Sequence, residues 1–109
     1  MKINKPKHLN SMNDFEKKHS PVIEIISSKV IVKIGNGIEH PMNPEHFITW
    51  VELFLNGEHL ERKELDSEDE PAATFELDSE PSPLDSITAR SNCNIHGTWE
   101  SVKKGSVYI

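Results

Sequence analysis

The chain has 109 residues, of which 35% are hydrophobic and 28% are charged, and its formal net charge is −6. This length fits one domain with a modest core, and the acidic balance argues against nucleic acid and anionic membranes as partners, because both are bound through excess Lys and Arg. No apolar run reaches the roughly 18 residues of a membrane span, and no signal-peptide pattern follows the N-terminus. We therefore expect a cytoplasmic protein.

The charge is unevenly distributed along the chain. Residues 1–20 contain five lysines against Asp14 and Glu16, a net charge of +3, whereas residues 21–109 contain seven basic and sixteen acidic residues, a net charge of −9. A local basic patch on an acidic body attracts small anions to a nearby site. We interpret residues 1–20 as an N-terminal arm and residues 21–109 as a single folded domain.

The arm is expected to be extended at first and then to form one short helix. Residues 1–10 have no apolar period. Ser11 precedes Asp14 at the spacing of a capping box, which predicts that a helix begins there.

From Pro21 onward the sequence is typical of strands and turns, because short runs of β-branched and aromatic residues alternate with clusters of Gly, Pro, Asn, Asp and Ser. Asn56-Gly57 is the strongest short hairpin signal, since both positions of a type I′ turn need positive φ. Strands of this number and spacing predict an all-β fold, an antiparallel sandwich of about seven strands. The predicted strands are 22–27, 29–34, 47–55, 58–64, 73–77, 85–91 and 98–102.

Five potential metal ligands lie near the ends of these predicted strands. Cys93 and His96 are three residues apart in one loop, and His40 and His46 bracket a segment whose two prolines stiffen a second loop. His19 lies where the arm joins the first strand. The ends of a sandwich bring such boundaries together, so these side chains predict one metal site.

The kinds of ligand narrow the choice of metal. Structural zinc usually closes a tetrahedron with four ligands, which is fewer than the five donors available here. A blue-copper site usually needs an axial Met, and residues 97–100 after the Cys-x-x-His segment contain none. Iron accepts more ligands, and five on an octahedral ion leave one position open. His8 and His59 are interpreted as ordinary surface residues.

Three segments, EKKHSPVIE, EHPMNPEHFITWVEL and ARSNCNIHGTWES, resemble the iron-binding domain of superoxide reductases, known as neelaredoxin and as the catalytic half of desulfoferrodoxin. The likeness runs from Glu16 to Ser101. It implies an immunoglobulin-like sandwich around one mononuclear non-haem iron (Fe2+/Fe3+) that reduces superoxide to hydrogen peroxide at the open position. The ligands that it implies are four imidazoles in a plane and one axial thiolate, from His19, His40, His46, His96 and Cys93.

The first ligand segment departs from the family pattern. Members usually carry Glu-Lys-His there, where the Lys attracts superoxide and the Glu can occupy the sixth position of oxidised iron. Lys18 matches the Lys, but Lys17 stands where the Glu would be, and Glu16 is displaced by one residue. Lys18 and Glu16 are the candidate catalytic residues, and the sixth position is left open between Glu16, Lys17 and solvent.

The resemblance also predicts partners. Cys93 is the sole cysteine, so this chain cannot hold the additional four-cysteine iron centre of some family members, and its electrons must come from a small carrier such as rubredoxin. We further expect a homo-oligomer, either a dimer or a tetramer. Trp50 and Trp99 are interpreted as core residues, with Trp99 near the site.

Two other functional classes stay open at this point. One is a non-catalytic metal-binding or electron-transfer β-sandwich that uses the same ligands. The other is an immunoglobulin-like interaction module whose histidines are incidental.

Overall fold

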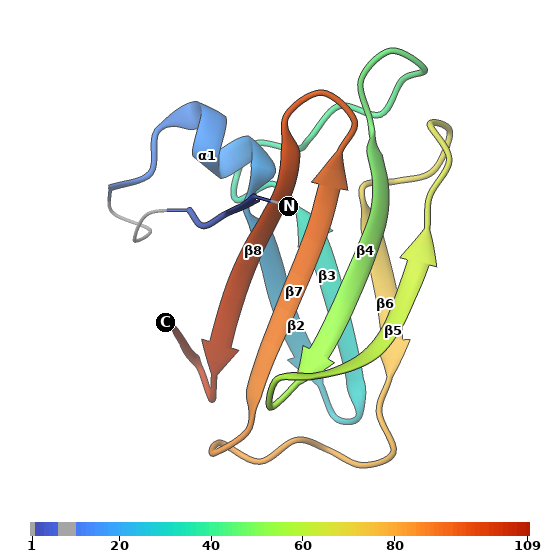
Figure 1. Ribbon diagram of the computed structural model, residues 1–109. Helices are drawn as coiled ribbons and strands as arrows, with labels where there is room; N and C mark the ends of the chain where they lie inside the picture. The colour runs from blue at the N-terminus through green and yellow to red at the C-terminus, as the bar shows by residue number, and fades with distance from the viewer. Residues whose placement is uncertain (1, 7–10) are drawn as a thin grey trace.

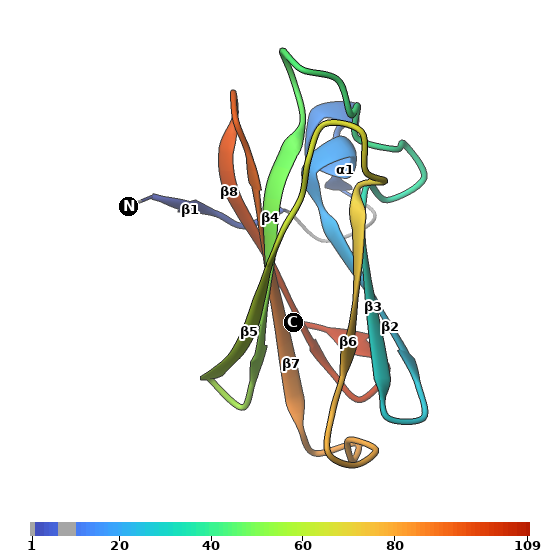
Figure 2. The same cartoon turned by 90° about the vertical axis from the view of Figure 1, so that its right-hand side faces the viewer.

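The computed structural model describes residues 2–6 and 11–109, which form two β-sheets packed face to face with a short helix near one end (Figures 1 and 2). The larger sheet has the strand order β1-β8-β7-β4-β5, with β9 paired to β8, and the smaller sheet has the order β2-β3-β6. The larger sheet contains β1 (Ile3–Asn4), β4 (Ile48–Leu55), β5 (Glu58–Glu64), β7 (Ser86–Cys93), β8 (Gly97–Lys104) and β9 (Val107–Tyr108). The smaller sheet contains β2 (Pro21–Ile26), β3 (Lys29–Ile34) and β6 (Ala72–Glu76).

The predicted all-β sandwich is confirmed, and each of the seven predicted strands is present within two residues of its expected bounds. The β4–β5 hairpin turns at Asn56 and Gly57, whose φ angles are 50° and 84°, as a type I′ turn requires. β1 and β9 were not predicted, because two-residue strands are too short to show a period. β1 pairs with β8 in parallel, a long-range contact that local sequence does not reveal.

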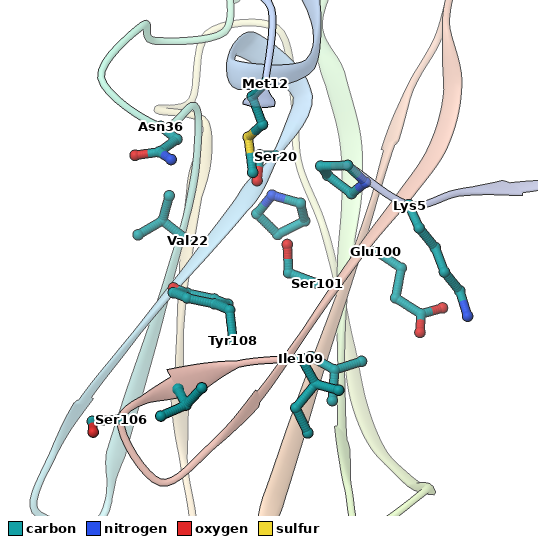
Figure 3. A pocket seen from close by; sticks show the side chains of 14 residues that line it. Lys5, Met12, Ser20, Val22, Asn36, Glu100, Ser101, Ser106, Tyr108 and Ile109 are labelled. Carbon is teal, nitrogen blue, oxygen red and sulfur yellow. The ribbon is translucent and has the colours of Figure 1, made fainter. Parts of the chain in front are cut away.

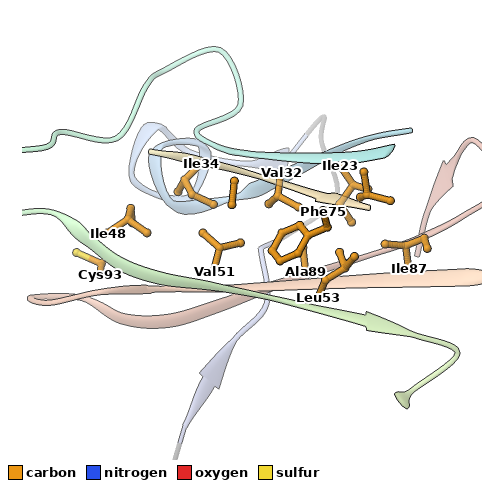
Figure 4. Close-up of a cluster of buried hydrophobic side chains, with 12 residues drawn as sticks. Ile23, Val32, Ile34, Ile48, Val51, Leu53, Phe75, Ile87, Ala89 and Cys93 are labelled. Carbon is orange, nitrogen blue, oxygen red and sulfur yellow. The ribbon is translucent and has the colours of Figure 1, made fainter. Parts of the chain in front are cut away.

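The core fills the space between the two sheets (Figure 4). Burial alternates strictly along β7, so that every second side chain points inward. Val32 and Phe75 of the smaller sheet and Val51 and Ala89 of the larger sheet belong to one buried cluster. Cys93 belongs to the same cluster, at the end where β7 stops. Because fully burying a side chain such as Phe75 stabilises the fold by about 1.5–3 kcal/mol, this core fixes the frame on which the loops at that end are mounted.

The predicted helix is present as α1 (Asp14–His19), but its predicted cap was wrong. The N-cap is Asn13 and its reciprocal partner is Glu16, rather than Ser11 and Asp14. In a capping box the side chain at the third helical position must reach back to the backbone amide of the N-cap, which a Glu or Gln side chain can do. The side chain of Asp14 is one methylene shorter.

Three further expectations concern the chain as a whole. The division into an arm of residues 1–20 and a domain of residues 21–109 stays a prediction. His8 lies outside the described residues. In the described part of the chain, no helix is long and apolar enough to cross a membrane.

Candidate metal centre

His19 is the last residue of α1, and the helix controls where its ring points. Its side chain is buried, and its Nδ1 lies 2.8 Å from the carbonyl oxygen of Phe15, one turn earlier. A protonated Nδ1 that donates to this carbonyl leaves the lone pair on Nε2. The Nε2 end of the ring can therefore act as a ligand.

His40 and His46 come from the loop between β3 and β4. The backbone amide of His40 donates to the carbonyl of Ile34 at the end of β3, and its Nδ1 lies 2.8 Å from the carbonyl oxygen of Pro41. Asn43 and His46 exchange two backbone hydrogen bonds, which close a tight turn between the two histidines. The loop thus fixes the His40 ring through a backbone carbonyl and fixes the backbone of His46 through the tight turn.

Cys93 and His96 belong to the turn between β7 and β8. Gly97 ends this turn at a φ of 80°, a left-handed conformation that favours glycine. The backbone amide of His96 donates to Cys93 Sγ at 3.4 Å, and the indole Nε1 of Trp99 donates to the His96 carbonyl at 3.1 Å. These contacts fix the His96 backbone and the Cys93 sulfur, and the His96 ring lies next to that sulfur, with Nδ1 3.7 Å from Sγ.

Asn94 connects this turn to the loop that carries His46. Its side-chain oxygen accepts a hydrogen bond from the amide of Phe47, and its side-chain amide donates to the carbonyl of Glu45. The two loops therefore form one polar network, although they are nearly fifty residues apart in the sequence.

All five predicted ligands meet at this end of the sandwich. One ligand atom from each of His19, His40, His46 and Cys93 lies within 4.8 Å of the other three. His96 joins them through its Nδ1, which lies 3.1 Å from His19 Nε2 and 3.7 Å from Cys93 Sγ.

The four imidazoles form a square. Neighbouring ring centroids around the cycle His19, His40, His46, His96 are separated by 4.9, 4.8, 5.1 and 4.9 Å, and the diagonal between His19 and His46 is 6.4 Å. Each neighbouring pair meets nearly edge to face. This arrangement presents ring nitrogens toward a common centre.

Two buried nitrogens show that the centre fits a cation. The Nε2 atoms of His40 and His46 are buried without a hydrogen-bond partner among the described residues. A buried polar atom without a partner costs about 1–3 kcal/mol, and coordination of a metal ion removes that cost. Imidazoles with one thiolate are a donor set that suits iron.

The protonation of the histidines agrees with this fit. Burial lowers the pKa of His40 to about 4, and burial is also the largest cause of the lowered pKa values of His19 and His46. The charges of His96 and Lys18 lower both of these pKa values further, and that of His46 also lowers the pKa of His19. The lowered pKa values of His19, His40 and His46 favour their neutral rings, the form in which imidazole binds metals.

The remaining predicted residues surround the centre or lie apart from it. Lys18 is close enough to lower the pKa of both His19 and His46. Glu16 Oε1 accepts a hydrogen bond from the Asn13 amide in the capping box, at 3.5 Å, and its role at a sixth iron position stays a prediction. His59 is exposed and contacts Glu52 on the outer face of the larger sheet, as expected of an ordinary surface residue.

Both tryptophans are buried, as predicted. Trp99 stacks on the ring of His19, whereas Trp50 is covered by the guanidinium of Arg62, 4.3 Å from its ring centroid. Phe15 was not singled out from the sequence, although its ring contacts His19 and His96. Phe15 precedes His19 by four residues, and residues at this spacing are neighbours on the surface of a helix, so the sequence could have predicted the contact between them.

A cavity of about 560 Å³ lies apart from this centre, and none of the five ligand candidates lines it (Figure 3). It opens between β2, β8 and β9, and its walls include Val22, Val102 and Tyr108. Its lining is mainly apolar, and it contains no group of potential metal ligands among the described residues.

The desulfoferrodoxin family model matches residues 11–102 of the chain. The chain belongs to the desulfoferrodoxin family. It is 41% identical over 93 residues to a desulfoferrodoxin homolog of Archaeoglobus fulgidus, covering 85% of this chain and 69% of the relative. It is also 38% identical to the superoxide reductase of Pyrococcus abyssi, covering 77% of this chain and 84% of that protein.

A solved structure of this family has the same fold. The superoxide reductase (neelaredoxin) of Ignicoccus hospitalis superposes with a TM-score of 0.74 at 29% identity, covering 94% of this chain and 92% of that one. The fold on which the desulfoferrodoxin-type centre is built is therefore shared over almost the whole length of both chains.

Proposed function

We propose that this protein is a superoxide reductase that uses one mononuclear non-haem iron ion. The observation that carries the proposal is the square of four imidazoles beside a buried thiol. The same chemistry is named for the relatives from Pyrococcus abyssi and Ignicoccus hospitalis. The proposed ligands are His19, His40, His46, His96 and Cys93.

Bound ferrous iron would supply a single electron, so that superoxide, one electron and two protons give hydrogen peroxide. The five side chains would hold the ion and leave a further coordination position for a small molecule. The neutral imidazoles add no charge to the centre, and the Cys93 thiolate adds one negative charge. This charge favours oxidation of the metal, much as an axial thiolate donates electron density in haem enzymes.

The backbone around Cys93 prepares it for this role. The His96 amide, 3.4 Å from Cys93 Sγ, donates a hydrogen bond to it, which helps to fix the position of the sulfur. Cys93 is also buried, so that water does not compete for the sulfur.

Lys18 is proposed to attract the substrate. Its position beside His19 and His46 adds positive potential near the centre, in a protein whose formal net charge is −6. Glu16 and Lys17 are the nearby residues of α1 proposed as alternatives to solvent at the sixth position of the oxidised state.

The proposal extends to partners and compartment. The protein would receive electrons from a small carrier such as rubredoxin, assemble as a homodimer or homotetramer, and act in the cytoplasm. Co-purification of the electron carrier from the native source tests the first point. Measurement of the mass of the protein in solution tests its oligomeric state.

The competing function is a non-catalytic metal-binding or electron-transfer protein with the same ligands. Rapid mixing of the ferrous protein with superoxide separates the two. The reductase reading predicts that superoxide oxidises the iron in a fast bimolecular reaction, seen as a ferric–thiolate absorption band. A ferrous protein that keeps its spectrum in excess superoxide would support the non-catalytic reading.

A further inference from the structure

Two aromatic side chains, Phe15 and Trp99, pack together against His19 and His96, and we call this pair the aromatic cover. The Phe15 centroid lies 4.5 Å from that of His19 and 4.9 Å from that of His96. Trp99 stacks on His19 at 5.0 Å with an interplanar angle of 24°, and the two cover rings are 5.6 Å apart. The cover thus contacts two neighbouring imidazoles of the square, His19 and His96.

Each member of the cover also holds one histidine by a hydrogen bond. The carbonyl oxygen of Phe15 lies 2.8 Å from His19 Nδ1, and Trp99 Nε1 donates to the carbonyl of His96 at 3.1 Å. The bond to Nδ1 restricts rotation of the His19 ring, the bond from Trp99 fixes the backbone of His96, and the ring contacts restrict the position of both imidazoles. A supporting shell of this kind is what keeps metal ligands in place.

The cover joins two parts of the chain that are far apart. His19 ends a six-residue helix, and His96 lies 77 positions later in the β7–β8 turn. Isolated helices of fewer than about 12 residues are marginal in water, so α1 depends on packing for its stability. The Phe15 ring supplies that packing, because it contacts His96 in the β7–β8 turn and Trp99 in β8.

The cover also changes the electrostatics of the centre. Trp99 is buried and Phe15 is 46% exposed, so Phe15 separates the two imidazoles from solvent on this side. Oxidised iron carries one more positive charge than reduced iron, and an apolar environment disfavours the more highly charged state. An intact cover therefore favours the reduced metal.

We propose that Phe15 and Trp99 are positioning residues that dock α1 on the β7–β8 turn and raise the reduction potential of the centre. The inference rests on the proposed iron site. It goes beyond that proposal because neither residue is among the five proposed ligands.

The test compares four variants by two measurements, the midpoint potential of the iron protein and the affinity of the metal-free protein for Co2+. Phe15→Ala and Phe15→Gln suit a helix but open the cover to water, so both should lower the potential and weaken Co2+ binding about 10-fold, as loss of a supporting residue typically does. Phe15→Tyr keeps the ring and should match the wild type. The matched control is Ile26→Ala, because Ile26 is exposed to a similar extent (51%) at the far end of β2.

The outcomes separate this inference from the proposed function. A wild-type protein that neither retains iron nor reacts with superoxide refutes the proposed function. If the wild type binds iron and reacts, but the potentials and Co2+ affinities of Phe15→Ala and Phe15→Gln equal those of the wild type, the cover has no positioning role and only this inference fails. Since Phe15 is half exposed, the glutamine variant keeps the test decisive even if the alanine variant does not fold.

Discussion

Two histidines of the centre, His19 and His40, direct their Nδ1 atoms to backbone carbonyls. This pairing decides which ring nitrogen can bind a metal. His19 is paired with the Phe15 carbonyl and His40 with the Pro41 carbonyl, each at 2.8 Å. His96 instead turns its Nδ1 toward Cys93 and His19. The backbone thereby selects Nε2 as the ligand atom of His19 and His40, whereas the His96 ring presents its Nδ1, a distinction that the sequence does not reveal.

At the residue scale, Cys93→Ser should remove the ferric–thiolate band and weaken iron binding. Serine is a poor ligand for a metal held by imidazoles, and its hydroxyl stays protonated at neutral pH. The measurement is the iron content and absorption spectrum of the oxidised protein. A serine variant with full iron content and an unchanged spectrum would favour the view that the histidines and cysteine are incidental.

Lys18→Ala should slow the reaction with superoxide about threefold to tenfold at low salt. The field of all the charges of a protein can accelerate association by about 10- to 1,000-fold, and a single lysine near the site contributes part of that effect. It should also flatten the dependence of the rate on ionic strength. Lys29→Ala is the control, because it removes the same charge from an exposed site at the start of β3. Equal salt dependence in the wild type and Lys18→Ala would exclude steering by Lys18.

At the scale of elements, α1 is a six-residue helix that carries a ligand at its last position, so its cap matters for the metal. Asn13→Ala removes the acceptor for the Glu16 amide and should cost about 1 kcal/mol of stability. The same change should weaken Co2+ binding, because His19 is positioned by the helix. Asn13→Asp, which caps equally well, should preserve both quantities; equal loss in both variants would mean that the cap is not the cause.

The C-terminal strand β9 protects the free edge of β2 through Tyr108. Its hydroxyl accepts a hydrogen bond from the Ile23 amide at 2.8 Å and donates to the Ile23 carbonyl at 3.3 Å. Burial raises the pKa of Tyr108, so the folded protein favours the neutral phenol. The stability that this preference contributes is fully present below the ordinary tyrosine pKa of about 10 and is lost as pH rises through the higher folded value.

Tyr108→Phe should therefore lower the free energy of unfolding by about 1–3 kcal/mol at pH 7, because it leaves the Ile23 amide without its partner. It should also remove the part of the alkaline destabilisation that comes from this residue. Urea unfolding from pH 7 to pH 11 measures both effects. Tyr108 is the only tyrosine, so its ionisation can be followed directly by ultraviolet absorbance; a titration at its ordinary pKa would contradict the argument.

At the scale of the whole molecule, the sequence predicted the sandwich because β-branched runs and an Asn-Gly turn are local signals. It also predicted the five ligand candidates, because each lies at a strand boundary. It did not predict β1, β9 or the place of Phe15 beside His96, since these depend on contacts between distant segments. The capping box was misplaced by two residues because Ser11–Asp14 and Asn13–Glu16 have the same spacing.

The site joins α1, the β3–β4 loop and the β7–β8 turn at one end of the sandwich, so removal of the metal should destabilise the whole fold (Figure 1). Binding to the native state alone adds about 2.7 kcal/mol when metal is present at about 100 times its Kd, which is roughly 10 °C in Tm for a domain of this size. Thermal unfolding before and after chelation measures the difference. His46→Asn, which lacks one ligand, should show a much smaller effect of the chelator.

The central claim, reduction of superoxide at an open centre of four imidazoles and one thiolate, is tested most directly by the products of the reaction. Protein kept reduced by an external donor is supplied with a known amount of superoxide, and hydrogen peroxide and oxygen are measured together. The account predicts one peroxide for each superoxide consumed and no oxygen. Oxygen released in equal amount to peroxide would indicate dismutation, and no peroxide above the uncatalysed yield would exclude the enzyme.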